Sequence, residues 1–297
     1  PPDGSTCPRG HPTPGGVGVS GPRIISCGGG AQSSALVVLA ATHDPDFEAI
    51  VGGPVDAAVM ANVGDNSEHP DAIEWVRNTL TPWAADRGFR IVEVQRKYRD
   101  GRDPDLLANV LRSGSRSIPI PVRMANGAPG RRLCTADWKI RVIAKWTKAH
   151  GASEADPATV AIGFSTDEVE RVGGRRNIPH EVAVYPLIDL GMSRNDCQQL
   201  NVATFGRPAP KSSCWFCPFH TRDVWAEMRR DRPDLFWRSF DLERTINERR
   251  ETLGKDHVYL TRFGRPLDEA VGMAQDMLPG LEHDLGETGC DEGGCFT

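Results

Sequence analysis

Short apolar runs alternate with longer amphipathic segments through the first half of the chain. The short runs are rich in Ile, Val and Ala, so they predict strands at 23–27, 56–63, 89–95 and 158–165. The segments between them repeat apolar residues at helical spacing and predict helices at 33–43, 70–88 and 135–151. Pro70 stands at the start of the second of these helices and Gly88 at its end, as expected at helix boundaries.

This alternation predicts an α/β fold. Strand–helix–strand repetition is typical of a doubly wound, mostly parallel sheet, here of five strands, with helices on both faces. Beyond residue 186 the strand signal fades, and the pattern predicts a mostly helical C-terminal region. Ligands of such sheets bind at the carboxyl ends of the strands, near the point where the strand order reverses.

The chain of 297 residues divides by composition into four predicted parts. Residues 1–21 are rich in Pro and Gly and are interpreted as a flexible leader, and residues 22–186 carry the α/β pattern. Residues 187–280 form the mostly helical region with a Cys-x-x-Cys pair, and residues 281–297 form an acidic, cysteine-containing tail. A hydrophobic fraction of 39% is enough to fill a core.

Charge is unevenly distributed along the chain. The formal net charge of −5 argues against a protein that is cationic over its whole surface. Residues 96–148 nevertheless hold 13 Lys and Arg against 4 Asp and Glu, whereas residues 267–297 hold 8 Asp and Glu and no Lys or Arg. The basic segment is therefore a candidate surface for an anionic partner, including a nucleic-acid acceptor, or for the acidic tail. An ordinary solvated surface is the alternative.

No segment of the sequence predicts a membrane anchor. The apolar runs are shorter than the ~20 residues that span a bilayer, and the N-terminal segment has no apolar signal-peptide stretch. We therefore expect a cytoplasmic protein without a membrane partner. Stable disulfides are rare in that compartment, so the 8 cysteines require burial or metal binding as an explanation.

A run of three glycines, Gly28–Gly30, stands between the first predicted strand and the first predicted helix. Glycine lets backbone N–H groups approach an anion closely, and the helix that follows contributes the positive end of its dipole. Ser33 and Ser34 add hydroxyl groups, so the segment suits a phosphate or a sulfate. Neither a Gly-Lys-Ser/Thr ending nor the spacing Gly-x-Gly-x-x-Gly is present, and a plain strand–helix turn stays open as the alternative.

Three cysteines are candidates for metal binding. Cys214 and Cys217 form a Cys-x-x-Cys pair, a spacing that points two sulfurs at one centre. Cys134 lies far upstream, just before a predicted helix, and would join them through folding. Zinc, an iron–sulfur cluster and a redox pair are the three interpretations of these residue types. Cations that can offset thiolate charge lie near Cys134 in the sequence: Arg131, Arg132 and Lys139.

Several segments together resemble one superfamily. "GGGAQSSA" resembles the Ser-Gly-Gly-x-Asp-Ser loop of the adenine-nucleotide alpha-hydrolase, or PP-loop, superfamily, with Gln32 at the Asp position. The Gln and the segment "MANVGDNSEHPDAIEWV" are most similar to its phosphoadenosine phosphosulfate (PAPS) reductase-like branch. "RRLCTADWKI", "YPLIDLGMSRNDCQQL" and "CWFC" resemble the cluster-binding segments of that branch and of the related DNA phosphorothioation sulfurtransferases. The resemblance covers roughly residues 23–220.

The resemblance implies two ligands. One is an adenine nucleotide, either ATP or PAPS or adenylylsulfate, in residues 22–186. Its implied contacts are Gly28, Gly29, Gly30, Gln32, Ser33 and Ser34, with Asp65 near the ribose or the base. The other is a [4Fe-4S] cluster on Cys134, Cys214 and Cys217. Two departures from the family stand out: Gln32 replaces the Asp of many ATP-cleaving members, and Cys134 lacks the adjacent cysteine of adenylylsulfate reductases.

The C-terminal segment "ETGCDEGGCFT" carries Cys290 and Cys295. In sulfonucleotide reductases a tail cysteine attacks sulfur and carries it covalently, so the resemblance makes these two residues candidate catalytic thiols. Alternatively, one of them completes the cluster, or the tail is inert. Three further residues are interpreted as structural: Cys27 and Cys197 as packing residues and His220 as a loop residue.

The resemblance thus implies a sulfur-transfer enzyme of the PAPS reductase-like family. It would use an adenine nucleotide and an iron–sulfur cluster, with a sulfur or electron donor protein as partner. It would either thiolate a nucleic-acid or small-molecule acceptor or reduce a sulfonucleotide. Two alternatives remain: a nucleotide-binding regulatory or structural module stapled by zinc, and a DNA-modification component that acts only with partners.

Overall fold

The computed structural model describes residues 21–172 and 177–272. The predicted leader apart from Gly21, and the predicted acidic tail with Cys290 and Cys295, lie outside these residues. Within them, no helix combines the length and the apolar character needed to cross a bilayer.

Five parallel strands form one sheet, in the order β3-β2-β1-β4-β5. The order reverses between β1 and β4, and this switch point is where sheets of this kind bind ligands. The strands are β1 (Arg23–Cys27), β2 (Ala57–Asn62), β3 (Ile91–Gln95), β4 (Ala158–Ile162) and β5 (Glu181–Val184).

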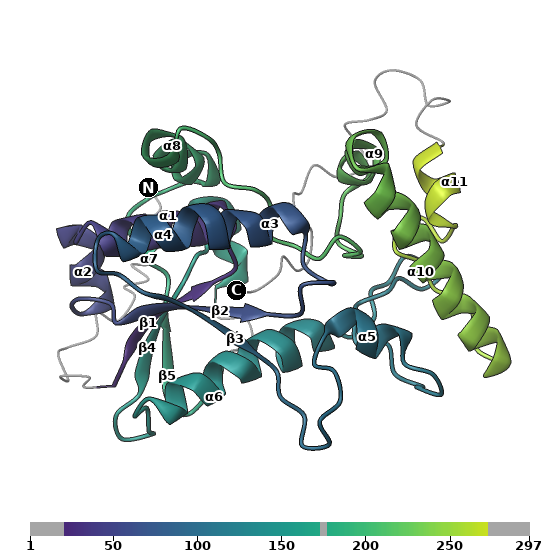
Figure 1. The fold of residues 1–297 in the computed structure, drawn as a ribbon, viewed down its shortest axis with the longest axis horizontal. Coiled ribbons are helices and arrows are strands. Elements are labelled where there is room, and N and C mark those ends of the chain that lie inside the picture. Colours follow the sequence, from purple (N-terminus) through teal and green to yellow (C-terminus); the bar gives the residue numbers. More distant parts are fainter. Residues whose placement is uncertain (1–20, 173–176, 273–297) are drawn as a thin grey trace, which may run out of the picture.

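Helices cover both faces of the sheet (Figure 1). The amphipathic helix α6 (Arg141–Ala149), preceded by the π-helix η2 (Cys134–Ile140), lies on one face. The opposite face is covered by α1 (Ala31–Ala41), α2 (Pro45–Val51), α3 (Pro70–Trp75), the π-helix η1 (Val76–Leu80), α4 (Thr81–Ala85), α7 (Pro186–Asp189) and α8 (Arg194–Phe205).

Side chains that alternate along each strand contribute to two hydrophobic cores, one on each face of the sheet. Ile25 and Cys27 of β1 pack with Ala161 of β4 in the core beneath α1. Ile24 and Val160, one position away on the same strands, pack in the core beneath α6. Successive residues of a strand point to opposite faces, so strands covered on both sides must be apolar throughout, as these are.

A third core joins the sheet to the C-terminal helices. Trp225 and Phe236, from two helices of the C-terminal region, pack there with Val63, which follows β2, and with Trp138 of η2. Cys214 belongs to the same core. The remaining helices are α5 (Leu106–Leu111), the 3-10 helix η3 (Thr166–Arg171), α9 (Arg222–Asp231), α10 (Pro233–Thr252) and α11 (Leu267–Gly272). Figure 1 shows α9–α11 grouped beside the sheet half of the molecule.

The predicted fold class is confirmed. The sheet has five parallel strands with helices on both faces, and helices dominate after residue 186. Four strands coincide with the apolar runs that predicted them. The fifth strand, β5, is only four residues long and two of its side chains are Glu181 and the exposed Val182, so its sequence carries no strong strand pattern.

A buried carboxylate fastens the C-terminal region to α10. Glu243 is 4% exposed and accepts hydrogen bonds from the backbone N–H groups of Leu260 (2.6 Å) and Leu267 (3.0 Å). Burial raises the pKa of Glu243 to about 7, against the opposing effect of these two hydrogen bonds. The segment that leads into α11 therefore depends on a side chain that titrates near neutral pH.

We expect this carboxylate to make stability fall as the pH rises from about 4.5 to about 7. In that range the folded protein keeps a proton that the unfolded chain has released, so proton release favours unfolding. Relative to Glu243→Gln, the wild type should lose up to about 3 kcal/mol of unfolding free energy across the range, measured by denaturant titrations at successive pH values. Glu248→Gln, on the exposed side of the same helix, is the control. Parallel curves for the wild type and Glu243→Gln would contradict the assignment.

Candidate functional site

The glycine run lies at the carboxyl end of the central strand. Gly28–Gly30 link β1 to α1, and Gly30 has the extended backbone that precedes the helix. Across the switch point, the segment after β4 approaches the same loop: a Cβ on Gly163 would lie 3.2 Å from the backbone N of Ser33. The predicted nucleotide loop therefore stands where a doubly wound sheet places its ligand.

Both serines of the loop make hydrogen bonds inside the protein. The Ser33 hydroxyl accepts from the backbone N–H groups of Gly28 (3.3 Å) and Gly30 (3.1 Å). The Ser34 hydroxyl accepts from the indole N–H of Trp75 at 3.0 Å, and Ser34 is fully buried. The serines thus hold the loop in shape, and their predicted contact with a nucleotide stays a prediction.

Two glycines of the loop leave little room for a side chain. Gly29 has a φ of +74°, and a Cβ there would collide with Cγ2 of Val76. A Cβ on Gly30 would lie 2.7 Å from the hydroxyl oxygen of Ser212. Glycine is therefore required by the packing of the loop itself, which supports the plain strand–helix turn as well as a ligand site.

Gln32 bridges the switch point. Its amide donates to a carboxylate oxygen of Glu168 at 3.1 Å, and Glu168 also pairs with Arg171. Gln32 belongs to α1, whereas Glu168 and Arg171 belong to η3, which follows β4. This side chain thus spans the crevice between the two halves of the sheet.

Asp65, which follows β2, belongs to an ionic network with residues of β2, β3 and η1. Arg77 donates two hydrogen bonds of 2.8 Å to Asp65 and pairs with Glu93, while Asn62 donates to both carboxylates. The hydrogen bonds from Arg77 hold the pKa of Asp65 below its usual value. Asp65 is a charged partner of Arg77, and its contact with the ribose or the base of a nucleotide stays a prediction.

The Cys-x-x-Cys pair forms a tight turn between α8 and α9. The N–H of Cys217 donates to the carbonyl of Cys214 at 3.2 Å. His220 closes the turn, because its Nε2 lies 2.9 Å from the same carbonyl. Burial lowers the pKa of His220 to about 3, so the ring is neutral and donates through Nε2. His220 is therefore a buried part of the turn and not an ordinary loop residue.

Backbone and side-chain hydrogen bonds attach this turn to the loop after β2. Cys214 pairs with Glu68 in an antiparallel bridge, and the N–H of His69 donates to the carbonyl of Ser213 at 3.0 Å. The indole N–H of Trp215 donates to the carbonyl of Asn66 at 2.7 Å. The turn is thereby held at the carboxyl edge of the sheet by a loop that is distant from it in the sequence.

Cys134 is the first residue of the π-helix η2. Its N–H donates to the carbonyl of Pro119 at 2.8 Å, and Trp138, one turn later, donates to the carbonyl of Pro104 at 2.7 Å. The wider turn of a π-helix brings residues five positions apart to the same side, which places Lys139 near Cys134. Single π-helical turns occur frequently at functional sites.

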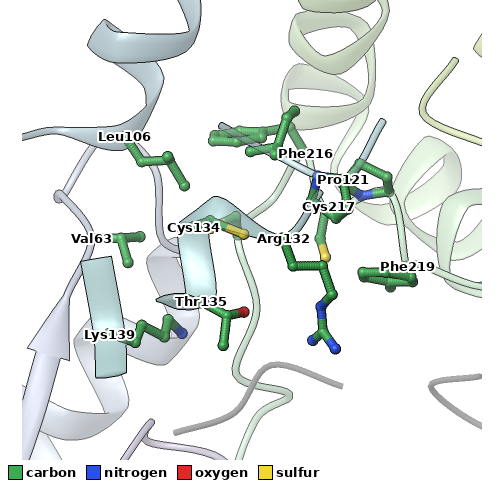
Figure 2. Close-up of a pocket in the computed structure, with 13 residues that line it drawn as sticks. Val63, Leu106, Pro121, Arg132, Cys134, Thr135, Lys139, Phe216, Cys217 and Phe219 are labelled. Atoms are coloured by element: carbon green, nitrogen blue, oxygen red, sulfur yellow. The ribbon is translucent and has the colours of Figure 1, made fainter. Parts of the chain in front are cut away.

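The three candidate metal-binding cysteines line one pocket. Figure 2 shows Cys134 and Cys217 approaching it from different segments, with Phe216 and Leu106 on one side and Lys139 on the other. Most of the lining is apolar, with Arg132 and Lys139 as its charged members. The lining residues are Val63, Leu106, Ile120, Pro121, Arg132, Cys134, Thr135, Lys139, Cys214, Phe216, Cys217, Pro218 and Phe219.

A buried ion pair lies beside the pocket. The Nζ of Lys139 is 3.6 Å from a carboxylate oxygen of Glu68, and both side chains are at most 5% exposed. Burial raises the pKa of the Cys27 thiol, and the charge of nearby Lys139 opposes this rise. The positive charge of Lys139 therefore affects both the pocket, which Lys139 lines, and the thiol of Cys27 at the end of β1.

The structure brings together most of the predicted site residues. The glycine loop and the cysteine pocket are neighbours, because Gly30 packs against Ser212, two residues before Cys214. Within residues 21–172 and 177–272, no three His, Cys, Asp or Glu side chains are arranged to hold a metal ion. Cys290 and Cys295 lie outside these residues.

Sequence reasoning missed three residues that shape the site: Glu68, Ser212 and Trp75. Each acts through a contact between distant segments, so no local pattern marks it. A partial signal existed for Glu68 and Trp75, because both lie in the segment at 60–76 that contributed to the family resemblance. Cys197, predicted to be a packing residue, is fully buried in α8.

Comparison of the chain with protein-family models, with curated proteins and with solved structures gave no match.

The crowding at Gly29 predicts a large effect of a single methyl group. Gly29→Ala should lower the free energy of unfolding by about 1–3 kcal/mol more than Gly88→Ala, because overpacking adds to the cost of the backbone conformation. Gly88 is a matched control: its φ is also +74°, but a Cβ there would meet nothing within 4 Å. The two variants are compared by chemical denaturation. Equal losses of stability would mean that the loop can move away from Val76.

Proposed function

We propose that this protein is a sulfur-transfer enzyme that binds an adenine nucleotide at the switch point and a [4Fe-4S] cluster in the cysteine pocket. This proposal places it in the PAPS reductase-like branch of the PP-loop superfamily. The observation that carries it is the pocket itself: Cys134 joins Cys214 and Cys217 there, although it lies in a different half of the chain.

The residues of the pocket fit an iron–sulfur cluster. Three cysteines from two segments line the pocket among mostly apolar residues, and Arg132 and Lys139 supply positive charge against a thiolate-bound cluster. A cluster distributes its ligands over several iron atoms, so it does not require the three sulfurs to surround a single ion, an arrangement the described residues lack. The fourth ligand would come from Cys290, Cys295 or a substrate.

The cluster, when bound, would supply a site for handling sulfur or for electron transfer. The chain's own residues define what surrounds it. Lys139 lines the pocket, its charge opposes the rise in the pKa of the Cys27 thiol before the glycine loop, and Glu68 lies 3.6 Å from its Nζ. Phe219 covers the rim and lies 4.9 Å from the guanidinium groups of both Arg123 and Arg132. Arg132 and Lys139 thus add positive charge to the pocket lining, and Phe219 adds an apolar ring beside them.

The nucleotide would lie across the carboxyl ends of β1 and β4. Its phosphate or sulfate group would meet the amino end of α1, while Gln32 would exchange its bond to Glu168 for one to the ligand. The short path from Gly30 through Ser212 to the cysteine turn would bring the ligand near the pocket. This proximity favours a chemical role for the cysteines over a remote structural one.

Zinc is the competing ligand, since a Cys-x-x-Cys turn is also typical of structural zinc sites. A zinc staple would make the protein a nucleotide-binding module without sulfur chemistry. Elemental analysis separates the two proposals directly.

We expect anaerobically purified protein to contain iron and acid-labile sulfide and to be brown. Cys134→Ser, Cys214→Ser and Cys217→Ser should each lose the iron and the visible absorption, because each removes one ligand of the same cluster. Cys197→Ala, which changes a buried cysteine of α8 outside the pocket, should keep both. Stoichiometric zinc without iron would refute the cluster and support the staple.

The same measurements on variants of the two tail cysteines distinguish three roles for the tail. Loss of iron in Cys290→Ser or Cys295→Ser would identify a fourth ligand. Retained iron without activity would identify a sulfur carrier, and no change in either variant would mark the tail as inert.

We expect one of ATP, PAPS and adenylylsulfate to bind with a clear preference in calorimetric titrations. Gln32→Ala should weaken that binding by roughly tenfold, the cost of about one hydrogen bond to a charged ligand. Gln95→Ala, at the exposed end of β3, is the control and should bind as the wild type does. Absence of binding for all three nucleotides would reject the proposed site.

A further inference from the structure

The exposed side of α6 carries a row of cations. Arg141, Lys145 and Lys148 stand at helical spacing and are all exposed, whereas Val142, Ile143 and Thr147 face the sheet. Arg141 pairs with Asp137 at 2.7 Å. The two lysines have no carboxylate partner among the ion pairs of the described residues.

The loop between β3 and α5 adds further cations to this row. Lys97 and Arg99 are exposed and, like the lysines of α6, make no ion pair with a described carboxylate. The loop is fastened to η2 near Asp137, which Arg96 approaches to 3.5 Å from the side opposite Arg141. The guanidinium of Arg96 also lies over the ring of Trp138 at 4.1 Å. Loop and helix thus form one continuous basic surface.

The acidic residues of the segment do little to neutralise this surface. Of the four in residues 96–148, Asp105 is buried as the N-cap of α5, and Asp137 lies between two arginines. Asp100 pairs with Arg102, so Asp103 is the one acidic residue of the segment that is neither buried nor in an ion pair within the described residues. Cations gathered on one face repel one another, so this arrangement is relieved when an anionic partner lies along it.

We propose that this basic surface binds the phosphate backbone of a nucleic acid. The cations of α6, from Arg141 to Lys148, span about 10 Å of the helix axis, given the rise of a helix, and Lys97 and Arg99 of the loop add to them. A small anion would engage one or two cations, whereas five cations spread over helix and loop match a chain of phosphates. A membrane surface fits less well, because anionic lipid is bound through apolar side chains as well as cations. Every large hydrophobic side chain exposed in the described residues lies outside α6 and residues 96–104.

The basic surface begins at the cysteine pocket. Arg131, which is exposed, and Arg132, which lines the pocket, precede Cys134, and η2 leads from there to Arg141, the first exposed cation of α6. A nucleic acid on the surface would therefore pass the mouth of the pocket. As a sulfur acceptor this nucleic acid rests on the proposed function, but its binding does not require the cysteines.

The test is a salt titration of binding, followed by fluorescence anisotropy with labelled duplex and single-stranded DNA and RNA on the full chain. Wild-type affinity should fall linearly with the logarithm of salt concentration, with little dependence on sequence. Lys145→Gln/Lys148→Gln should weaken binding and lower the slope by up to about 1.8 for duplex DNA, because each phosphate that is no longer neutralised lowers it by about 0.9. Lys97→Gln/Arg99→Gln should act in the same way.

A matched control changes the net charge equally on another surface. Arg244→Gln/Lys255→Gln removes two exposed cations of α10 and the turn after it, and should bind as the wild type does. Equal binding by this control and the α6 variant, binding to anionic vesicles in place of nucleic acid, or no binding at all would each overturn the proposal. Cys214→Ser separates the two proposals: it should lose iron but keep its affinity for nucleic acid.

Discussion

The site depends on one constraint: the Cys-x-x-Cys turn is bound to the loop that follows β2. The bridge between Cys214 and Glu68, and the hydrogen bond from Trp215 to Asn66, fix the turn at the carboxyl edge of the sheet. Because the turn cannot move away, Ser212 lies against Gly30 of the first loop. Because β1 and β4 are parallel neighbours in the sheet, the loops that follow them lie at this same edge.

Much of the fold could be predicted from the sequence because the sheet is buried on both faces. Such strands must be apolar throughout, so runs such as Ala57–Asn62 stand out from the amphipathic helices between them. The signal fails where burial is partial. In β5, at the edge of the sheet, Val182 is 46% exposed and Glu181 is buried against Thr147 of α6, from which it accepts a hydrogen bond. A short edge strand held by such contacts has no pattern of its own.

The site was predictable in its residue types and less so in their roles. The spacing of Cys214 and Cys217, with the family resemblance, was enough to expect Cys134 beside them, and all three line one pocket. The roles of the serines could not be predicted, because they depend on tertiary partners. Ser34 looks like a phosphate ligand in the sequence, yet it accepts a hydrogen bond from Trp75, a residue of another helix.

The buried pair of Lys139 and Glu68 shows why fold and site are not separable here. A charge taken out of water costs free energy unless a partner compensates it, and removing one member of a buried pair is more costly than removing both. Lys139 belongs to η2 and Glu68 to the loop that holds the cysteine turn, so the pair joins the two segments that carry the cysteines. A thiolate-bound ligand in the pocket would add negative charge beside Lys139. The same lysine would then stabilise both the contact between η2 and the loop after β2, through its ion pair with Glu68, and the ligand bound in the pocket.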